Sequence, residues 1–318
     1  MQVRRIRIDA EQAGQRIDNF LLRELKGVPK TRIYRLLRKG EVRVNGRRSG
    51  PEYKLAAGDE VRLPPVRATD QPEALPPGRG LLAQLEAAII YEDEGLLVLN
   101  KPPGIAVHGG SGVRHGVIEG LRALRPAAPF LELVHRLDRE TSGCLLIAKR
   151  RSRLRQLHEL LRTDAVEKRY LTLLGGNLPR GPVPVEAPLD RFHLQGGERM
   201  VRIADAGKHA RTVFRAVERF RGATLAEARI DTGRTHQIRV HAAHLGHPVV
   251  GDDKYGNREI NKLFRERGVR RLFLHAQSLT LHWPDAEPLT LTAPLYEDLE
   301  AALIRLREQN ETYDRRAE

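Results

Sequence analysis

Two short apolar runs stand on either side of a charged stretch near the middle of the chain. Residues 130–134 and 144–148 are almost wholly apolar, and polar residues bound each run. Short, bounded apolar runs are typical of buried strands. The stretch between them, 135–143, is charged and hydroxyl-rich and ends at Gly143, which can turn the chain without steric cost. The pattern predicts two core strands joined by a polar loop, a rigid place for the carboxylate of Asp138.

The N-terminal residues predict a small unit of strands and helices. Residues 3–8 alternate as a half-buried strand does, and apolar residues recur at helical spacing over 17–25 and again over 33–37. Asn45-Gly46 follows an alternating segment and predicts a hairpin. The second helix gathers its basic side chains on one face: Lys30, Arg32, Arg35, Arg38 and Lys39. Such a face can be a mere solvated surface, but this spacing also lets the side chains follow a row of phosphates.

Composition divides the chain into three parts. Residues 64–80 are rich in proline and glycine and poor in apolar residues, which predicts a semi-rigid linker. The linker separates an N-terminal domain, 1–63, from a large domain, 81–318. In the large domain the pattern predicts strands at 96–100, 167–175 and 271–276, and helices at 152–161 and 296–306. Basic and polar strands are expected between 189 and 220, where Lys208 lies on a strip suited to an RNA backbone.

Charge and cysteine content narrow the class of protein. The 318 residues hold 55 Lys+Arg against 41 Asp+Glu, a net charge of +14, which modestly favours a nucleic-acid partner. Cys144 is the only cysteine, so an intrachain disulfide is excluded and a reducing compartment is expected. No apolar run is long enough to span a bilayer, and the N-terminus does not lead into a signal sequence. These observations predict a cytoplasmic protein.

Four sequence motifs carry a resemblance to a known family. Asp138 beside Arg136 and Arg139 is, taken alone, a surface carboxylate in an ion-pair cluster. The order Arg-Leu-Asp-x-x-Thr-Ser-Gly at 136–143, however, resembles the catalytic motif of the pseudouridine synthases that modify ribosomal and transfer RNA. Lys-x-Tyr at 168–170 and Thr-Gly-Arg-x-His-Gln-Ile-Arg at 232–239 resemble the family's second and third motifs. Residues 15–18 and 38–46 resemble the S4 RNA-binding domain.

This resemblance implies a fold, a reaction and roles for individual residues. The implied fold is α+β, a mixed, largely antiparallel sheet preceded by a small S4 domain. The implied reaction is the isomerisation of specific uridines to pseudouridine in 23S ribosomal RNA, without a metal or cofactor, by a monomer. Asp138 is the implied catalytic carboxylate, paired with Arg234 and kept ionised by it, and Tyr170 stacks on the flipped uracil. Ile238 or another apolar side chain is expected on the far wall of the pocket. Besides the basic helix and Lys208, the expected RNA contacts are Arg136, His236, Gln237 and Arg239.

Other interpretations remain open at this point. Without its motif, Tyr170 is as well explained as a side chain packed at a strand end. A non-catalytic ribosome assembly factor built on an S4 domain, or a related synthase acting on other uridines of ribosomal or transfer RNA, is compatible with much of the chain. A hydrolase that uses histidine or a metal requires paired carboxylates or a ligand set. His236, His241, His244 and His247 have no cysteine or nearby carboxylate to complete such a set, so we expect no metal.

Overall fold

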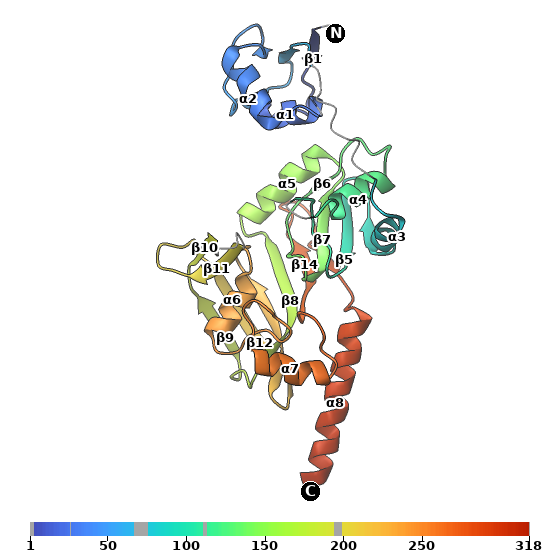
Figure 1. Ribbon diagram of the computed structural model, residues 1–318, viewed down its shortest axis with the longest axis vertical. Helices are drawn as coiled ribbons and strands as arrows, with labels where there is room; N and C mark the ends of the chain where they lie inside the picture. The colour runs from blue at the N-terminus through green and yellow to red at the C-terminus, as the bar shows by residue number, and fades with distance from the viewer. Residues whose placement is uncertain (1–2, 26, 67–75, 111–112, 194–198, 318) are drawn as a thin grey trace. The chain divides into compact units, whose positions relative to one another are not determined.

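The computed structural model describes residues 3–25, 27–66, 76–110, 113–193 and 199–317 (Figure 1). Its contacts divide the chain into two compact units, 1–76 and 77–318. Most of the predicted linker, 67–75, lies outside the described residues. The end of the predicted linker is wrong, because helix α3 (Arg79–Ala87) already begins within it. The two units are considered separately below.

The N-terminal unit packs two helices against a small antiparallel sheet. In the sheet, β3 (Glu60–Leu63) lies between β1 (Arg4–Arg7) and β2 (Arg43–Val44). Along the chain, helices α1 (Ile17–Glu24) and α2 (Lys30–Lys39) lie between β1 and β2. The helices bury Phe20 and Ile33 completely. The predicted hairpin is confirmed: Asn45 and Gly46 both have positive φ, 49° and 76°, as its tight turn requires.

The C-terminal unit is built on a mixed, largely antiparallel sheet. Ten of its described strands form one sheet, with the main order β4-β5-β7-β14-β8-β13-β12-β9, while β6 pairs with β7 and β15 with β14. Within it β7 and β14 are parallel and the other neighbours antiparallel. The strands are β4 (Ile89–Glu92), β5 (Leu96–Lys101), β6 (Glu132–Leu133), β7 (Ser142–Ala148), β8 (Val166–Gly175), β9 (Pro182–Glu186), β12 (Arg211–Phe220), β13 (Ala223–Ile230), β14 (Leu274–Leu281) and β15 (Leu289–Thr292). A separate hairpin joins β10 (Leu189–His193) to β11 (Arg199–Ile203). The predicted fold class is confirmed.

Helices cover both faces of this sheet (Figure 1). Helices α3, α4 (Val117–Leu124) and α6 (Gln237–His244) contribute to the hydrophobic core on one face. Helix α5 (Arg151–Arg162) contributes to a second core, and α7 (Arg258–Glu266) with α8 (Glu297–Ala317) to a third. The predicted end of the last helix, at 306, is wrong, because α8 continues to Ala317. No described helix combines the length and apolar character needed to cross a bilayer.

Strand β7 is buried on both faces, which explains its unbroken apolar sequence. Leu145 and Ile147 belong to the core beneath α4, while Cys144 and Leu146 belong to the core beneath α5. The Cys144 thiol is completely buried, and burial raises its pKa to about 12. The apolar run before the loop is only partly a strand, since β6 comprises two residues and pairs with the far end of β7.

Gly143 allows the loop between β6 and β7 to enter the sheet. Its φ is +110°, and a Cβ there would lie 2.2 Å from the carbonyl oxygen of Ala276 on β14. Backbone atoms cannot yield as a flexible side chain can, so a larger residue would separate the parallel pair of β7 and β14. The end of the Asp138 loop is therefore fixed where the two central strands meet.

Candidate active site

Asp138 lies in the loop between β6 and β7, with its side chain about a quarter exposed at 27%. The carbonyl oxygen of Asp138 accepts a hydrogen bond of 3.2 Å from the backbone N–H of Thr141, so the loop forms a tight turn. Thr141 itself is buried. The carboxylate thus projects from a short turn anchored in the core.

Lys101, at the end of β5, connects the Asp138 loop to the segment that directly follows β5, residues 102–105. Its ammonium is completely buried and donates to the carbonyl oxygens of Pro102 (2.6 Å), Ile105 (2.9 Å) and Arg139 (3.1 Å). Burial lowers the pKa of Lys101 to about 7, while Glu140 and Asp138 favour the charged form. Three carbonyl acceptors require three N–H donors, which only the ammonium offers. Lys101 therefore fixes the backbone directly after Asp138.

The other end of the loop is anchored through a buried histidine. Ser142, the first residue of β7, places its hydroxyl 2.9 Å from Nδ1 of His275, whose Nε2 lies 3.1 Å from the carbonyl oxygen of Ala293. Burial lowers the pKa of His275 to about 4, so its ring is neutral at pH 7. The neutral ring donates through Nε2 and accepts the Ser142 hydroxyl through Nδ1.

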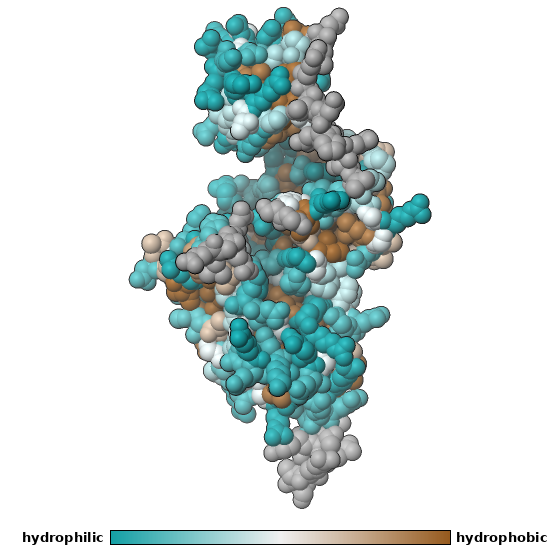
Figure 2. Space-filling view, in the orientation of Figure 1, coloured by the Kyte–Doolittle hydropathy of each residue, from teal (hydrophilic) through white to brown (hydrophobic). Residues whose placement is uncertain are grey.

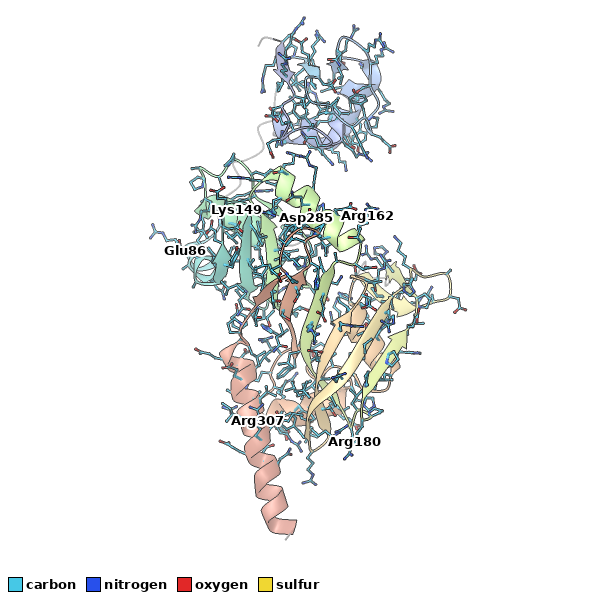
Figure 3. The ribbon with its side chains drawn as sticks, turned by 180° about the vertical axis from the view of Figure 1, so that it is seen from behind. Glu86, Lys149, Arg162, Arg180, Asp285 and Arg307 are labelled. Atoms are coloured by element: carbon cyan, nitrogen blue, oxygen red, sulfur yellow. The ribbon has the colours of Figure 1, made fainter. Side chains whose placement is uncertain are left out.

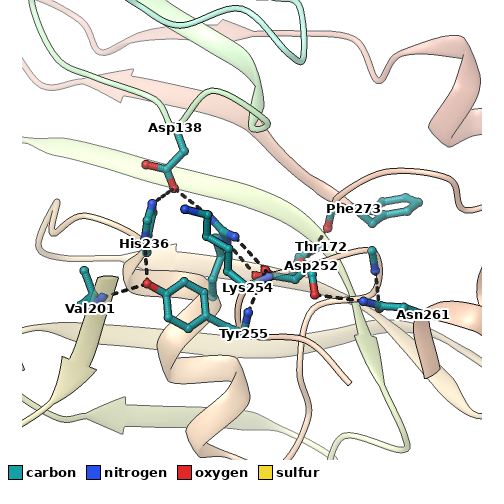
Figure 4. A network of polar contacts seen from close by, with 11 residues as sticks. Asp138, Thr172, Val201, His236, Asp252, Lys254, Tyr255, Asn261 and Phe273 are labelled. Atoms are coloured by element: carbon teal, nitrogen blue, oxygen red, sulfur yellow. Dashed lines mark hydrogen bonds and ion pairs between the residues drawn. The ribbon is translucent and has the colours of Figure 1, made fainter. Parts of the chain in front are cut away.

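Arg239, on α6, supplies the positive charge beside Asp138. Its Nη1 lies 3.7 Å from Oδ2 of Asp138, while Nε and Nη2 each donate to a different oxygen of Asp252 at 2.7 Å. Figure 4 shows this network, with Tyr255 alongside; the guanidinium carbon lies 5.1 Å from the centre of the Tyr255 ring. Burial opposes the charge on Arg239, but the hydrogen bonds and charge of Asp252, with the charge of Asp138, raise its pKa. A buried, doubly anchored cation thus faces the carboxylate.

The predicted ion pair between Asp138 and Arg234 is wrong. Nε of Arg234 donates to the carbonyl oxygen of His209 at 3.0 Å. Among the described residues, the basic side chains within 4 Å of the Asp138 carboxylate are Arg239 and His236. Arg234 precedes α6, whereas Arg239 lies within it and turns toward the core. Both arginines nevertheless border the same pocket.

His236 occupies a strained position beside Asp138. Its φ of 54° lies in the left-handed region, which is costly for a residue other than glycine. Nδ1 lies 2.8 Å from the hydroxyl of Tyr255, and that hydroxyl accepts from the backbone N–H of Val201 (Figure 4). Burial lowers the pKa of His236, although Asp138 opposes this effect. A neutral ring held this way directs Nε2 toward Asp138, at 3.9 Å.

A small pocket opens in front of Asp138. Tyr170 from β8 and Ile238 from α6 line it together with Leu137 and Leu274. Tyr170 is buried, and burial raises the pKa of its hydroxyl well above 10, with Asp138 adding to the effect. The hydroxyl is therefore neutral at pH 7. A carboxylate, a phenol and apolar walls converge on one space.

Gln237 requires a correction, because it is buried and fully hydrogen-bonded within the protein. Its Nε2 donates to the carbonyl oxygen of Arg211 and to the Thr212 hydroxyl, while its Oε1 accepts from Arg234 and Thr232. No donor of the amide remains for RNA, so the predicted RNA contact is wrong and Gln237 instead holds the start of α6. Arg239 is similarly committed to Asp252 and to the Asp138 carboxylate.

The remaining predicted RNA contacts lie on the surface. Arg136 is exposed at the pocket, and Lys208 is exposed beside β10. In the N-terminal unit Lys30, Arg35, Arg38 and Lys39 are exposed and Arg32 is half-buried. Hydrophilic side chains cover α2 in Figure 2. Within the described part of the chain, none of the five α2 residues forms an ion pair.

No group of histidine, cysteine and carboxylate side chains that could hold a metal occurs among the described residues. His241 shows why the histidines of this region do not form one. Its Nδ1 lies 2.9 Å from the Thr212 hydroxyl and its Nε2 3.0 Å from the carbonyl oxygen of Ala187. Both ring nitrogens are therefore occupied inside the core.

Three site residues escaped sequence reasoning: Lys101, Asp252 and Tyr255. The Lys-Pro-Pro-Gly order at 101–104 was visible, but nothing in it shows that the lysine points inward. Asp252 and Tyr255 lie in a turn-forming stretch, Gly-Asp-Asp-Lys-Tyr-Gly, in which a buried aspartate looks the same as an exposed one.

Comparison with known proteins decides the family. Residues 95–244 match the family model described as RNA pseudouridylate synthase, and residues 15–61 match the S4 domain. The chain is 55% identical over 309 residues to "Ribosomal large subunit pseudouridine synthase C" of Escherichia coli (strain K12), covering 96% of this chain and 97% of the relative. The chain belongs to the RNA pseudouridylate synthase family. The protein of that name from Yersinia pestis is 54% identical over 307 residues, covering 96% of each chain.

Solved structures agree with this assignment of the synthase. Human RNA Pseudouridylate Synthase Domain Containing 4 has a TM-score of 0.59 and 29% identity, covering 72% of this chain and 96% of the human chain. Human RNA Pseudouridylate Synthase Domain Containing 1 has a TM-score of 0.56 and 28% identity, covering 68% and 86%. The synthase is an enzyme with a pseudouridine synthase domain and an S4 RNA-binding domain, and Asp138, Tyr170 and Arg239 all lie within the matched synthase region.

Proposed function

We propose that the synthase isomerises specific uridines of 23S ribosomal RNA to pseudouridine, in the cytoplasm, with Asp138 as its catalytic carboxylate. One observation carries the proposal: a buried arginine, fixed by Asp252, faces Asp138 at 3.7 Å in a pocket that also holds Tyr170. The names of the relatives, which are 54–55% identical over almost the whole chain, support large-subunit ribosomal RNA as the substrate.

In the proposed reaction the N1–C1′ bond of uridine breaks, the base turns, and C5 bonds to C1′ in place of N1. Nothing is oxidised and no group is added, so no cofactor is required. Asp138 acts as an anion, either as a nucleophile or as a base. Arg239 stabilises that anion by charge and fixes its direction, because its own position is set by two hydrogen bonds to Asp252.

We assign Tyr170 to contact with the uracil of the target uridine. Its ring lines the pocket opposite Ile238, so a flipped uracil can stack on it. The raised pKa of Tyr170 keeps the phenol protonated, so it is not a standing base. It acts instead through its neutral hydroxyl, which can receive the C5 proton only while its own proton passes to N1 of the turned base. C5 loses one proton and N1 gains one, so the step balances.

RNA binding is assigned to exposed cations outside the pocket. Arg136 and Arg234 border the pocket, and Lys208 lies beside β10. The basic face of α2 supplies sequence-independent phosphate contacts from the N-terminal unit. We assign Arg234 to the RNA backbone at the mouth of the pocket, because its guanidinium is not committed to Asp138.

Pseudouridine mapping tests the proposal. Ribosomal RNA is mapped from cells with the gene, without it, and complemented with either the wild-type chain or Asp138→Asn. We expect one or more 23S sites to disappear on deletion and to return with the wild-type chain only. Purified Asp138→Asn binds an rRNA fragment within a few fold of wild type, because the change removes charge but little volume. An unchanged map on deletion, or full activity of Asp138→Asn, would favour the assembly-factor alternative.

A further inference from the structure

A second cavity shares part of its lining, including Tyr170, with the pocket in front of Asp138, which we call the uridine pocket. We call the second cavity the side cavity; it has a volume of about 980 Å³ and shares Arg136, Tyr170, Ile230 and Arg234 with the uridine pocket. This volume is at the upper end of the range of roughly 300–1,000 Å³ found for small-molecule sites. The two spaces therefore border one another, and a ligand that fills the first reaches the entrance of the second.

The walls of the side cavity combine a group of apolar side chains with charged ones. Leu133 and Leu161 contribute from β6 and α5, and Val166, Ile230 and Leu279 contribute from three adjacent strands. Arg162, labelled in Figure 3, lies at the rim in the last turn of α5, where it is paired with Glu159. Apolar walls bordered by polar groups suit a flat ligand that has polar edges.

Among the lining residues that lie on β8, β13 and β14, Lys168 is the charged one. It lies on β8 two residues before Tyr170, so both side chains leave the strand on the same face. Lys168 is only 8% exposed, and in the described part of the chain its ammonium forms neither a hydrogen bond nor an ion pair. Burial lowers the pKa of Lys168, while the charges of Asp164 and Asp231 partly oppose this effect. The ammonium is not among the fully buried polar atoms without a partner, so it faces the open space of the side cavity and is available to a ligand.

The surroundings of Lys168 favour a neutral acceptor over a phosphate. Asp164 and Asp231 are the charged groups that act on Lys168, and they would repel an anion placed beside it. Four arginines also line the side cavity: Arg122, Arg136, Arg162 and Arg234. A nucleobase, in contrast, offers flat faces to the leucine and valine walls and a carbonyl oxygen to the amine. A free base also becomes available there, because the flipping of one nucleotide weakens the stacking of its neighbours.

We propose that the side cavity receives a second unstacked base of the substrate RNA, and that Nζ of Lys168 donates to a carbonyl oxygen of that base. The inference rests on the proposed function, since it places the base next to the target uridine of the same RNA. Binding of this base offsets part of the cost of opening the RNA, and it selects targets by a neighbouring nucleotide.

A double-mutant cycle between protein and RNA tests the proposal. The RNA is an rRNA fragment that contains a uridine on which the enzyme acts. Each nucleotide near that uridine is replaced in turn by an abasic one. With the wild-type chain we expect one position at which loss of the base weakens binding about tenfold, or about 1.4 kcal/mol. With Lys168→Met the same abasic change should matter less than about twofold, because the contact is already lost. Lys262→Met, which removes an exposed charge from α7, should leave the tenfold effect intact.

Three results separate the outcomes. If every abasic position costs Lys168→Met as much as it costs the wild type, the proposal is overturned. It is also overturned if Lys168→Met cancels the effect of a neutral methylphosphonate linkage and not that of a missing base. Lys168 would then contact a phosphate of the backbone. The wild-type turnover of the intact fragment is measured in parallel; if that turnover is absent, it is the proposed function that fails.

A cavity-filling variant protects the test against a folding defect. Leu161→Trp places an indole in the side cavity and leaves Lys168 in place. We expect it to abolish the effect of the same abasic position, while a cooperative melting transition shows that the chain is folded. If Leu161→Trp retains the full tenfold effect, the base does not enter the side cavity.

Discussion

The arginines of this protein fall into two groups that differ in their partners. Arg239 is buried, and its guanidinium contacts Asp252, Asp138 and the ring of Tyr255. Arg35 and Arg38 on α2 are exposed and form no ion pair in the part of the chain that the structure describes. A committed cation fixes the direction of a carboxylate, whereas an uncommitted one remains available to a polyanion. Within one chain, therefore, the buried arginine serves the reaction and the exposed arginines are available to bind RNA.

Replacement of Arg239 gives the largest expected effect. Arg239→Met leaves two carboxylates without their cation, and removal of one partner of a buried pair costs about 3–5 kcal/mol. If the whole of that cost raises the barrier to reaction, turnover drops by roughly 10²- to 10⁴-fold. Single-turnover rates and melting curves measure the two contributions. Arg234→Met is the matched control and should melt like the wild type. A control more damaging to turnover than Arg239→Met would reverse the assignment.

Removal of one hydroxyl from the uridine pocket gives the next effect. Tyr170→Phe keeps the stacking surface but loses the neutral phenol, so RNA affinity should stay within a few fold. The rate at saturating RNA should fall by about 100-fold, within the range of general acid–base contributions. Fluorescence anisotropy and single-turnover assays give the two numbers. Normal turnover by this variant would mean that Tyr170 is a packing residue.

The α2 face should act on affinity alone. We expect the triple change of Arg32, Arg35 and Arg38 to glutamine to weaken binding of an rRNA fragment about tenfold or more. The slope of log affinity against log salt should fall by roughly two to three, because each lost phosphate contact removes about 0.7–0.9. Turnover at saturating RNA should not change. An unaltered salt slope would remove α2 from the RNA interface.

The buried His275 gives the smallest effect, visible only in stability. Its pKa is about 4 in the folded chain and about 6.5 unfolded, so between these values the unfolded chain binds more protons. Stability should therefore fall as pH falls from about 6.5 to 4, by roughly 2–3 kcal/mol for this group. In urea unfolding at several pH values, His275→Gln should show a shallower acid decline. His135, with a pKa also lowered to about 4 by burial, maintains part of the slope.

Local features of the fold were predictable, whereas partner choice in the site was not. Asn45-Gly46 and the strand β5 follow from neighbouring residues alone. Asp138 and Tyr170 were identified through their motifs, and both line one pocket. The prediction that Arg234, and not Arg239, pairs with Asp138 failed because both arginines lie in the same motif. Only the position at which α6 begins decides which of them points inward. Asp252, which fixes that choice, is far from Asp138 in sequence and stands in an ordinary turn.

The burial of Cys144 has a practical consequence for measuring motion in this enzyme. Its thiol is inaccessible on β7, and the pKa of about 12 keeps it from forming the reactive thiolate at neutral pH. A cysteine introduced at an exposed site, such as Lys262, would therefore react with a maleimide dye while the native thiol stays unlabelled. Because the chain has no other cysteine, two introduced cysteines, one in each unit, would report the distance between them by energy transfer in solution. The wild-type sequence thus already serves as the background for such labelling.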